Sequence, residues 1–164
     1  MSFGCSTGEE CASLREKYFL DDPIAGVDID EDNLQSCLEK NIPDTEFLYS
    51  NHRNLSKHAP YQAIFAMSVL CHWPKSKAIQ NISGLYTFDR FESKLSELHS
   101  LLQIGGLLIV FNANFRFCDT VLYNKYNVMD TSGSGKGNVH KFGKDNMKLK
   151  EQTYAECIFI KKFN

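Results

Sequence analysis

The hydrophobic pattern of the chain alternates between short apolar runs and segments of helical period. Such alternation is typical of strand–helix units stacked around a mainly parallel sheet. The pattern predicts five strands, at residues 1–4, 24–29, 46–50, 63–70 and 107–112. It predicts helices at residues 8–18, from about 30 to 40, and from about 89 to 102. We therefore expect an α/β fold with helices on both faces of the sheet.

Two of the predicted helices carry boundary signals. The cluster from Asp30 to Asn33 predicts the start of the second helix, because Asp and Asn side chains cap free backbone N–H groups. Asp89 followed by Glu92 has the spacing of a capping box at the start of the third helix. The pair Gly105-Gly106 predicts the end of that helix.

The tail predicts an antiparallel hairpin at the edge of the sheet. Residues 139–142 and 154–161 are the two apolar runs expected to pair. Residues 131–138, TSGSGKGN, have the composition of a loop. With these elements we expect a single domain over residues 1–164.

The overall charge is small, since 18 basic and 20 acidic residues give −2. A slightly acidic chain is not expected to have nucleic acid as its partner. The longest uninterrupted apolar stretch, Leu107 to Phe111, is far shorter than a membrane-spanning helix, so we expect a soluble, cytoplasmic protein. The six cysteines contain no CxxC pair, which favours reduced, packed thiols over a metal site.

The most informative motif is a turn from Phe3 to Gly8, between the first predicted strand and the first helix. Gly4 and Gly8 let a ligand approach the backbone closely, because glycine has no Cβ. Asp28 falls at the end of the second strand, twenty residues after Gly8. A carboxylate there accepts hydrogen bonds from both hydroxyls of a ribose. The turn and Asp28 together predict a ligand that contains adenosine.

Two glutamates after the turn discriminate between adenosine ligands. Glu9 and Glu10 would repel the pyrophosphate of a dinucleotide at the helix N-terminus. The dinucleotide pattern GxGxxG also fails, because Ser6 and Glu9 stand at its second and third glycine positions. S-adenosylmethionine has no phosphate and two cationic groups, so these residues favour it, and one glutamate is a candidate for its ammonium group. A capping box formed by Thr7 and Glu10 is an alternative explanation of the second glutamate.

These motifs resemble, in order, those of the class I S-adenosylmethionine-dependent methyltransferases. The turn GCSTGEE is particularly similar to that of the chemotaxis-receptor (glutamate) methyltransferases. The resemblance covers roughly residues 1–115 and continues through AGVDI, AIFAMSVL and GGLLI, at residues 25–29, 63–70 and 105–109. It implies a Rossmann-like, mainly parallel sheet with a C-terminal antiparallel hairpin, and S-adenosylmethionine as the cofactor.

The resemblance also implies a set of cofactor contacts. The turn would wrap the methionine part, Asp28 would hold the ribose, and Ile29 would pack on the adenine. Family members often place an acidic residue beside the adenine amino group, where this chain has Asn51, whose amide oxygen also accepts, followed by His52. The end of the fourth strand would supply backbone carbonyls to the ammonium group. The implied cofactor-binding residues are Phe3, Gly4, Cys5, Ser6, Gly8, Glu10, Asp28, Ile29, Asn51, His52, Met67 and Ser68.

One departure from the family concerns the first strand, which starts at Met1 and has about half the usual length. Family members normally have a helix or more before this strand, so we expect a domain that lacks its N-terminal helix. The corresponding residues commonly form the lid over the substrate. The acceptor, a small molecule or a protein, therefore stays unidentified, and the oligomeric state is open.

The segment Cys71-His72-Trp73 follows the fourth strand, where the methyl acceptor is expected. His72 is the candidate catalytic base for a hydroxyl or a protonated amine, whereas a carboxylate acceptor needs no base. A solvated loop histidine is the alternative, and Trp73 would either line the acceptor pocket or pack at the strand end. Arg116 is a candidate partner of an anionic substrate, or a solvated surface residue.

Three functions are consistent with these motifs. The first is an active methyltransferase, and the second is a module that binds S-adenosylmethionine but has lost its acceptor site. The third is a nucleotide-dependent oxidoreductase, which Glu9 disfavours. Turnover of the cofactor separates the first two, and affinity for NAD would indicate the third.

Overall fold

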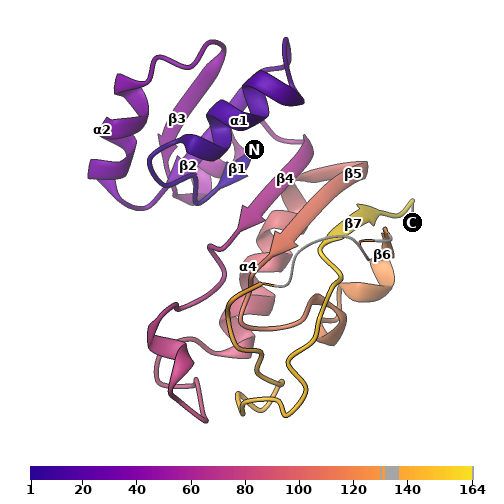
Figure 1. Cartoon of the computed structure of the whole chain (residues 1–164). Helices are drawn as coiled ribbons and strands as arrows, with labels where there is room; N and C mark the ends of the chain where they lie inside the picture. Colours follow the sequence, from indigo (N-terminus) through magenta and orange to yellow (C-terminus); the bar gives the residue numbers. More distant parts are fainter. Residues whose placement is uncertain (130, 132–136, 164) are drawn as a thin grey trace.

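A computed structural model of the chain describes residues 1–129, 131 and 137–163. Its strands form one seven-stranded sheet in the order β3-β2-β1-β4-β5-β7-β6 (Figure 1). The strands are β1 Ser2–Phe3, β2 Ile24–Asp28, β3 Thr45–Tyr49, β4 Tyr61–Met67, β5 Leu102–Phe111, β6 Tyr126–Val128 and β7 Ile158–Lys161. The α-helices are α1 Glu9–Lys17, α2 Glu31–Glu39, α3 His52–Ser56 and α4 Phe88–Leu101, and the 3-10 helices are η1 Lys75–Lys77, η2 Phe117–Asp119 and η3 Tyr123–Lys125.

The sheet is mainly parallel. β1 lies between β2 and β4, β3 pairs with the other edge of β2, and β5 pairs with β4, all in parallel. β7 is antiparallel to both β5 and β6. The predicted Rossmann-like sheet with an antiparallel C-terminal pair is thus confirmed. The chain winds outward from β1 to β3 and then returns to β4, so the strand order reverses between β1 and β4, which is where such sheets bind ligands.

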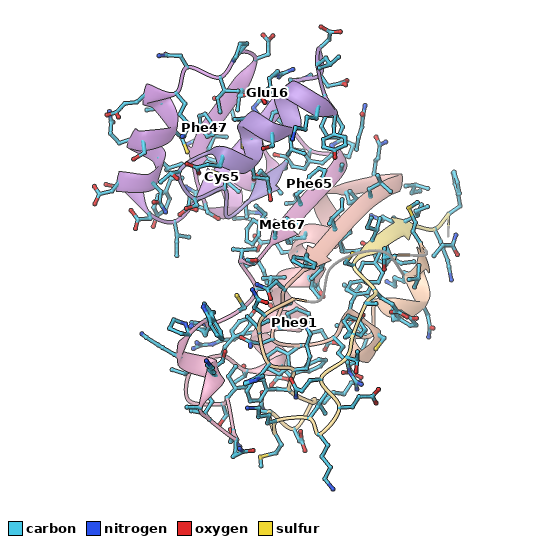
Figure 2. All side chains as sticks on the ribbon, viewed as in Figure 1. Cys5, Glu16, Phe47, Phe65, Met67 and Phe91 are labelled. Carbon is cyan, nitrogen blue, oxygen red and sulfur yellow. The ribbon has the colours of Figure 1, made fainter. Side chains whose placement is uncertain are left out.

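Helices cover both faces of the sheet, as predicted. Neighbouring residues of one strand point to opposite faces, so Ile64 joins the larger core whereas Phe65 packs against the smaller one. Figure 2 shows Cys5 and Phe47 among the side chains near α1 and α2, and Phe91 in the separate cluster below. The smaller core consists of Cys5, Cys11, Leu14, Ile24 and Cys37. The larger core includes Leu55 of α3 and Phe91, Leu95, Leu98 and Leu101 of α4.

The helix starts agree with the sequence in one case and differ in the other. Asp30 caps α2, because its carboxylate accepts hydrogen bonds from the N–H groups of Asp32 and Asn33. The capping box expected from Asp89 is wrong. Thr87 caps α4 instead, since its hydroxyl accepts from the N–H of Arg90 at 3.3 Å, and the helix therefore begins one residue before Asp89.

The predicted bounds of β4 and β5 were also inaccurate. β4 ends at Met67 rather than residue 70, because Ser68 has a φ of +58° and turns the chain out of the sheet. β5 follows α4 directly, and Gly105-Gly106 lies within this strand instead of ending the helix. The pairing shifts between Tyr61 and Ala63, so several β5 residues lie opposite two residues of β4. Gly105, at a φ of +74°, accommodates this bulge.

The expected hairpin of residues 139–142 and 154–161 is wrong. Residues 158–161 form β7, but its partners are β5 and the short β6. Val139 and Phe142 are buried without forming a strand, and Phe142 makes only isolated bridges to Phe115 and Lys148. The apolar character of residues 139–142 therefore reflects core packing. Most of the loop predicted at 131–138 lies outside the described residues.

The helices are short. The longest one among the described residues is α4, with 14 residues. None of the described helices has both the length and the apolar character needed to cross a membrane. Within the same part of the chain no disulfide joins the cysteines, and Cys5, Cys11 and Cys37 pack as small apolar side chains, as predicted.

Candidate active site

The turn between β1 and α1 adopts a left-handed backbone at three positions. Gly4, Ser6 and Gly8 have φ angles of +75°, +50° and +91°. Gly8 is also the residue that precedes α1, and its carbonyl accepts from the N–H of Ala12. The alternation of left-handed residues folds the turn tightly at the carboxyl end of β1.

Gly4 is required by space as well as by conformation. A Cβ on Gly4 would lie 2.3 Å from Cγ2 of Val69, in the segment that follows β4. Val69 thus places the end of β4 directly against the turn. This close approach brings the residues after β4 to the same site as the glycine turn, at the point where the strand order reverses.

Asp28 connects the end of β2 to the turn. One carboxylate oxygen accepts from the N–H of Ser6 at 2.8 Å, and the other accepts from the N–H of Asp30 at 3.0 Å and from the amide of Asn33 at 3.4 Å. The residue is buried, with 8% of its surface exposed. The predicted proximity of the turn and Asp28 is therefore present. Three donors occupy three of the roughly four acceptor positions of a carboxylate, which leaves capacity for a ligand hydroxyl.

A buried thiol fixes the orientation of the turn. The Cys37 thiol, from the end of α2, donates to the carbonyl of Ser6 at 3.1 Å. Because the peptide unit is planar and trans, the N–H of Thr7 points opposite to that carbonyl and away from α2. Nothing in the sequence pattern distinguishes Cys37 from other core cysteines, so sequence analysis missed this contact.

The two glutamates have separate partners, and the capping box predicted for Thr7 and Glu10 is wrong. No side chain caps α1. The hydroxyl of Thr7 donates to Glu9 at 2.6 Å, which lowers the pKa of that carboxyl to about 2, and Lys40 forms an ion pair with it at 3.2 Å. Glu10 points back along β1, where Ser2 donates to it at 2.6 Å, and burial raises the pKa of the Glu10 carboxyl.

The residues implied for the adenine side lie at the carboxyl ends of β2 and β3. Ile29 follows β2 and is 74% exposed, so its side chain is open to a planar ligand. The Asn51 side chain caps α3 by accepting from the N–H of Asn54 at 2.9 Å. His52 is exposed and lies 3.5 Å from the carboxylate of Glu97.

The residues implied for the methionine end lie where β4 stops. Met67 ends the strand, and Figure 2 places its label between the upper cluster with Cys5 and the lower cluster with Phe91. The hydroxyl of Ser68 accepts from the amide of Asn112 at 2.9 Å, which ties the end of β4 to the end of β5. Phe3 is buried in the larger core, so its contribution to a ligand site would come from its backbone.

The segment after β4 presents two aromatic side chains. His72 is exposed, and its ring lies 5.3 Å from that of Tyr86 between centroids. Its backbone N–H donates to the side chain of Asn114 at 2.7 Å. Trp73 is 49% exposed, with the ammonium group of Lys77 5.5 Å from its ring centroid. Both side chains are exposed in the segment that follows the carboxyl end of β4.

The residues that follow β5 mainly bind other parts of the fold. Asn114 is fully buried and binds the backbones of His72 and His140 and the hydroxyl of Ser76. Arg116 forms a double ion pair with Asp119 at 2.8 and 2.9 Å, so its charge is already neutralised. Arg116 is therefore partly exposed and already paired with a carboxylate. Sequence analysis missed the role of Asn114, although its position between the apolar Ala113 and Phe115 is a signal of burial.

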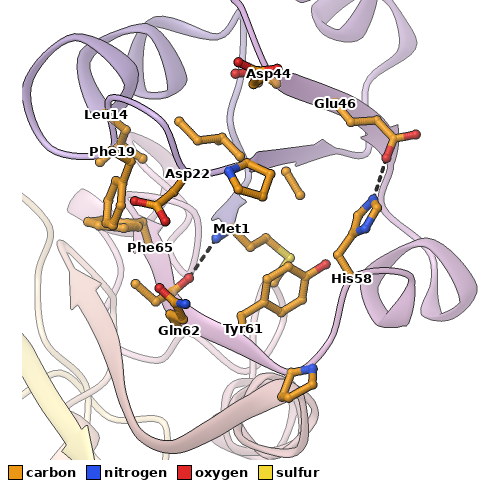
Figure 3. A pocket seen from close by; sticks show the side chains of 16 residues that line it. Met1, Leu14, Phe19, Asp22, Asp44, Glu46, His58, Tyr61, Gln62 and Phe65 are labelled. Carbon is orange, nitrogen blue, oxygen red and sulfur yellow. Dashed lines mark hydrogen bonds and ion pairs between the residues drawn. The ribbon is translucent and has the colours of Figure 1, made fainter.

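A cavity of about 560 Å³ lies at the opposite end of the parallel strands (Figure 3). Its walls include Met1, Ile24, Tyr61 and Ala63, which stand at the amino ends of β1, β2 and β4. Ligands of open parallel sheets bind at the carboxyl ends of the strands. The cavity is therefore separate from the site built by the turn and Asp28.

A glycine turn at the switch point, with a carboxylate ending the neighbouring strand, is the arrangement by which open α/β sheets bind nucleosides. The chain belongs to the methyltransferase domain family, whose pattern matches residues 1–110. The resemblance of the motifs to methyltransferases is thereby confirmed. No curated protein matches the chain.

Solved structures share the fold. A putative rRNA methylase from Clostridium thermocellum has a TM-score of 0.57 and 17% sequence identity, over 99% of this chain and 88% of that chain. The plantazolicin methyltransferase BpumL, in complex with a monoazolic desmethylPZN analog and SAH, has a TM-score of 0.50 and 19% identity, over 66% of this chain and 36% of that chain. The chain thus spans about a third of the length of BpumL. At these identities the likeness concerns the fold.

Proposed function

We propose that the chain transfers a methyl group from S-adenosylmethionine to an acceptor. The observation that carries this proposal is the 2.8 Å hydrogen bond from the N–H of Ser6 to Asp28. This bond joins the glycine turn and the carboxylate expected to hold the ribose in one site. Membership of the methyltransferase domain family supports the reaction. The complex of BpumL with SAH, the product left when S-adenosylmethionine gives up its methyl group, supports the cofactor.

The residues around the turn fit this cofactor. Gly4 and Gly8 allow close approach of the methionine part, and Asp28 accepts from the ribose. Ile29 covers the adenine, with Asn51 and His52 beside it. Met67 and Ser68 offer backbone carbonyls to the ammonium group. Phe3, Cys5 and Ser6 contribute through the backbone of the turn. Besides the cofactor contact that the resemblance implies, we assign Glu10 a second role behind the turn, where it accepts a hydrogen bond from the hydroxyl of Ser2.

The chemistry demands little of the protein beyond positioning. S-adenosylmethionine supplies a methyl carbon that its sulfonium has already activated; an acceptor lone pair bonds to it while the carbon–sulfur electron pair stays on sulfur. Val69 lies against the turn and Ser68 ties the end of β4 to the end of β5, beside the place where the methyl group would lie. We assign His72 the proton that an acceptor hydroxyl or amine releases, because its ring is exposed on the acceptor side.

The cytoplasm is the location that we propose for this reaction. The packed thiols Cys5, Cys11 and Cys37 and the absence of a disulfide among the described residues fit a reducing compartment. Cell fractionation of an epitope-tagged chain tests this location, and recovery only in an oxidising compartment would contradict it.

Calorimetric titration with S-adenosylhomocysteine tests the proposed function, with NAD as the control ligand. We expect micromolar affinity for the first and no binding of the second. Affinity for NAD, or no binding of S-adenosylhomocysteine by a folded sample, would overturn the proposal. Release of S-adenosylhomocysteine in an acceptor screen then separates an active enzyme from a module that only binds the cofactor.

A further inference from the structure

Two segments distant in the sequence meet beside His72 and form a surface that we call the basic rim. It consists of Trp73, Lys75, Lys77, His140 and Lys148. The carbonyl of Lys77 accepts both from the ring N–H of His140 at 3.0 Å and from the ammonium group of Lys148 at 3.1 Å. A single carbonyl therefore joins residues 72–78 to residues 139–150.

The charge of the basic rim is not balanced locally. Residues 72–78 contain two lysines and no acid, and residues 139–150 contain four lysines and one aspartate, although Lys141 among them is buried and donates to the carbonyl of Ala113. Among the described residues, the ion pairs involve none of the three rim lysines. The total charge by itself predicts no nucleic-acid partner. It conceals, however, an uneven distribution of charge over the surface.

The basic rim is continuous with the acceptor side of the site. The thiol of Cys71 donates to the carbonyl of Ser68 at 3.2 Å, which keeps the chain compact between the end of β4 and His72. The side chain of Asn114 binds the N–H of His72 and the carbonyl of His140 at 2.7 and 2.9 Å. One buried asparagine therefore positions both the candidate base and the start of the second rim segment.

We propose that the methyl acceptor is a single-stranded nucleic acid that the basic rim holds. This inference rests on the proposed function and names its substrate class. Three lysines on one surface exceed what a single carboxylate needs, and they match a chain of repeated phosphates. Trp73 is 49% exposed, and such a ring stacks on an unpaired base, which an acidic peptide would not supply.

Trp73 is the only tryptophan of the chain, so its fluorescence reports directly on the basic rim. The probe is a 12-nucleotide oligouridine, titrated into the full chain at low salt. We expect quenching on binding, and with three phosphates contacted we expect affinity to fall roughly 20-fold between 50 and 200 mM salt. No quenching, or equal quenching by a polyglutamate peptide or by benzoate, would overturn the proposal.

A charge variant tests whether binding occurs at the rim. We expect the double variant Lys75→Ala with Lys77→Ala to bind a fluorescein-labelled oligouridine roughly 10- to 30-fold more weakly by anisotropy, because each lost contact removes counterion release. Lys17→Ala, on the exposed side of α1, is the matched control and should bind normally. Equal loss in Lys17→Ala, or no loss in the double variant, would overturn the assignment.

The same samples distinguish failure of this inference from failure of the proposed function. Both charge variants should bind S-adenosylhomocysteine like the parent chain, because the rim lysines lie outside the turn and Asp28. Normal S-adenosylhomocysteine binding without oligouridine binding overturns the nucleic-acid acceptor and leaves methyl transfer intact. If the folded parent chain does not bind S-adenosylhomocysteine, both the nucleic-acid acceptor and the proposed function are overturned.

Discussion

Asp28 accepts a hydrogen bond from the N–H of Ser6 across 22 residues of sequence, and this bond joins the end of β2 to the turn after β1. The carboxylate thus has two roles, because it shapes the turn and is the group that we expect to hold the ribose. A mutation at this position should therefore affect cofactor affinity more than stability.

We predict that Asp28→Ala weakens S-adenosylhomocysteine binding roughly 10- to 100-fold, the cost of losing a charged hydrogen-bond acceptor. Calorimetry measures the affinity, and thermal unfolding verifies that the variant is folded. Asp32→Ala is the matched control, since Asp32 is exposed in the first turn of α2. Unchanged affinity in Asp28→Ala would contradict our placement of the ribose.

Gly4 and Gly84 form a matched pair of glycines. An added Cβ on Gly4 would meet Val69 at 2.3 Å with φ at +75°, whereas one on Gly84 would have no heavy atom within 4 Å. We predict that Gly4→Ala costs about 1 to 3 kcal/mol of stability and disrupts S-adenosylhomocysteine binding, and that Gly84→Ala changes neither. Chemical denaturation and calorimetry give the two values. Equal effects of the two substitutions would show that the turn tolerates a side chain.

Asn114 connects three backbone or side-chain partners from different segments. Its replacement by alanine leaves the N–H of His72 and the carbonyl of His140 without this partner, so we predict a loss of about 2 to 4 kcal/mol in the free energy of unfolding. Asn124→Ala is the control, because Asn124 is exposed on η3. A loss below about 1 kcal/mol in denaturant unfolding of Asn114→Ala would refute this role.

Arg15 is a buried cation whose guanidinium binds five carbonyl groups. It donates to the carbonyls of Phe19, Leu20, Asp22, Pro43 and Asp44. A lysine lacks the planar fork and the number of donors, so we predict that Arg15→Lys costs about 2 to 4 kcal/mol of stability. Arg53→Lys is the control for the substitution itself, since Arg53 is exposed on α3. Denaturant unfolding of both variants tests the prediction, and equal stabilities would contradict it.

The lowered pKa of His99 predicts that the stability of the fold depends on pH in the acid range. Burial, with the nearby Lys161 and Lys125, lowers the pKa of His99 to about 4 from an ordinary 6.5. The unfolded chain therefore binds this proton first, and stability is lost as the pH falls from about 6.5 to 4. We expect about 1 to 2 kcal/mol after allowance for solvent screening. His99→Gln should flatten this part of the pH profile of the unfolding free energy, and an unchanged profile would exclude His99 as its cause.

The sequence by itself determined the parallel part of the fold and the centre of the site. Apolar runs such as residues 63–70 mark buried strands. Gly4 and Gly8 specify the turn through their own backbone, and Asp30 caps α2 through its side chain. The spacing from Gly8 to Asp28 placed the carboxylate correctly, because a strand–helix–strand unit has a nearly fixed length.

Only the tertiary structure decided which residues complete this frame. The edge strands β6 and β7 pair across some thirty residues of chain, so the apolar run at residues 139–142 was mistaken for a strand when it fills the core. Glu10 accepts a hydrogen bond from Ser2, Arg116 pairs with Asp119, and the carbonyl of Lys77 accepts from Lys148. Periodicity reports burial and local hydrogen bonding, whereas the partner of a polar or charged side chain depends on which distant segments the packed core brings together.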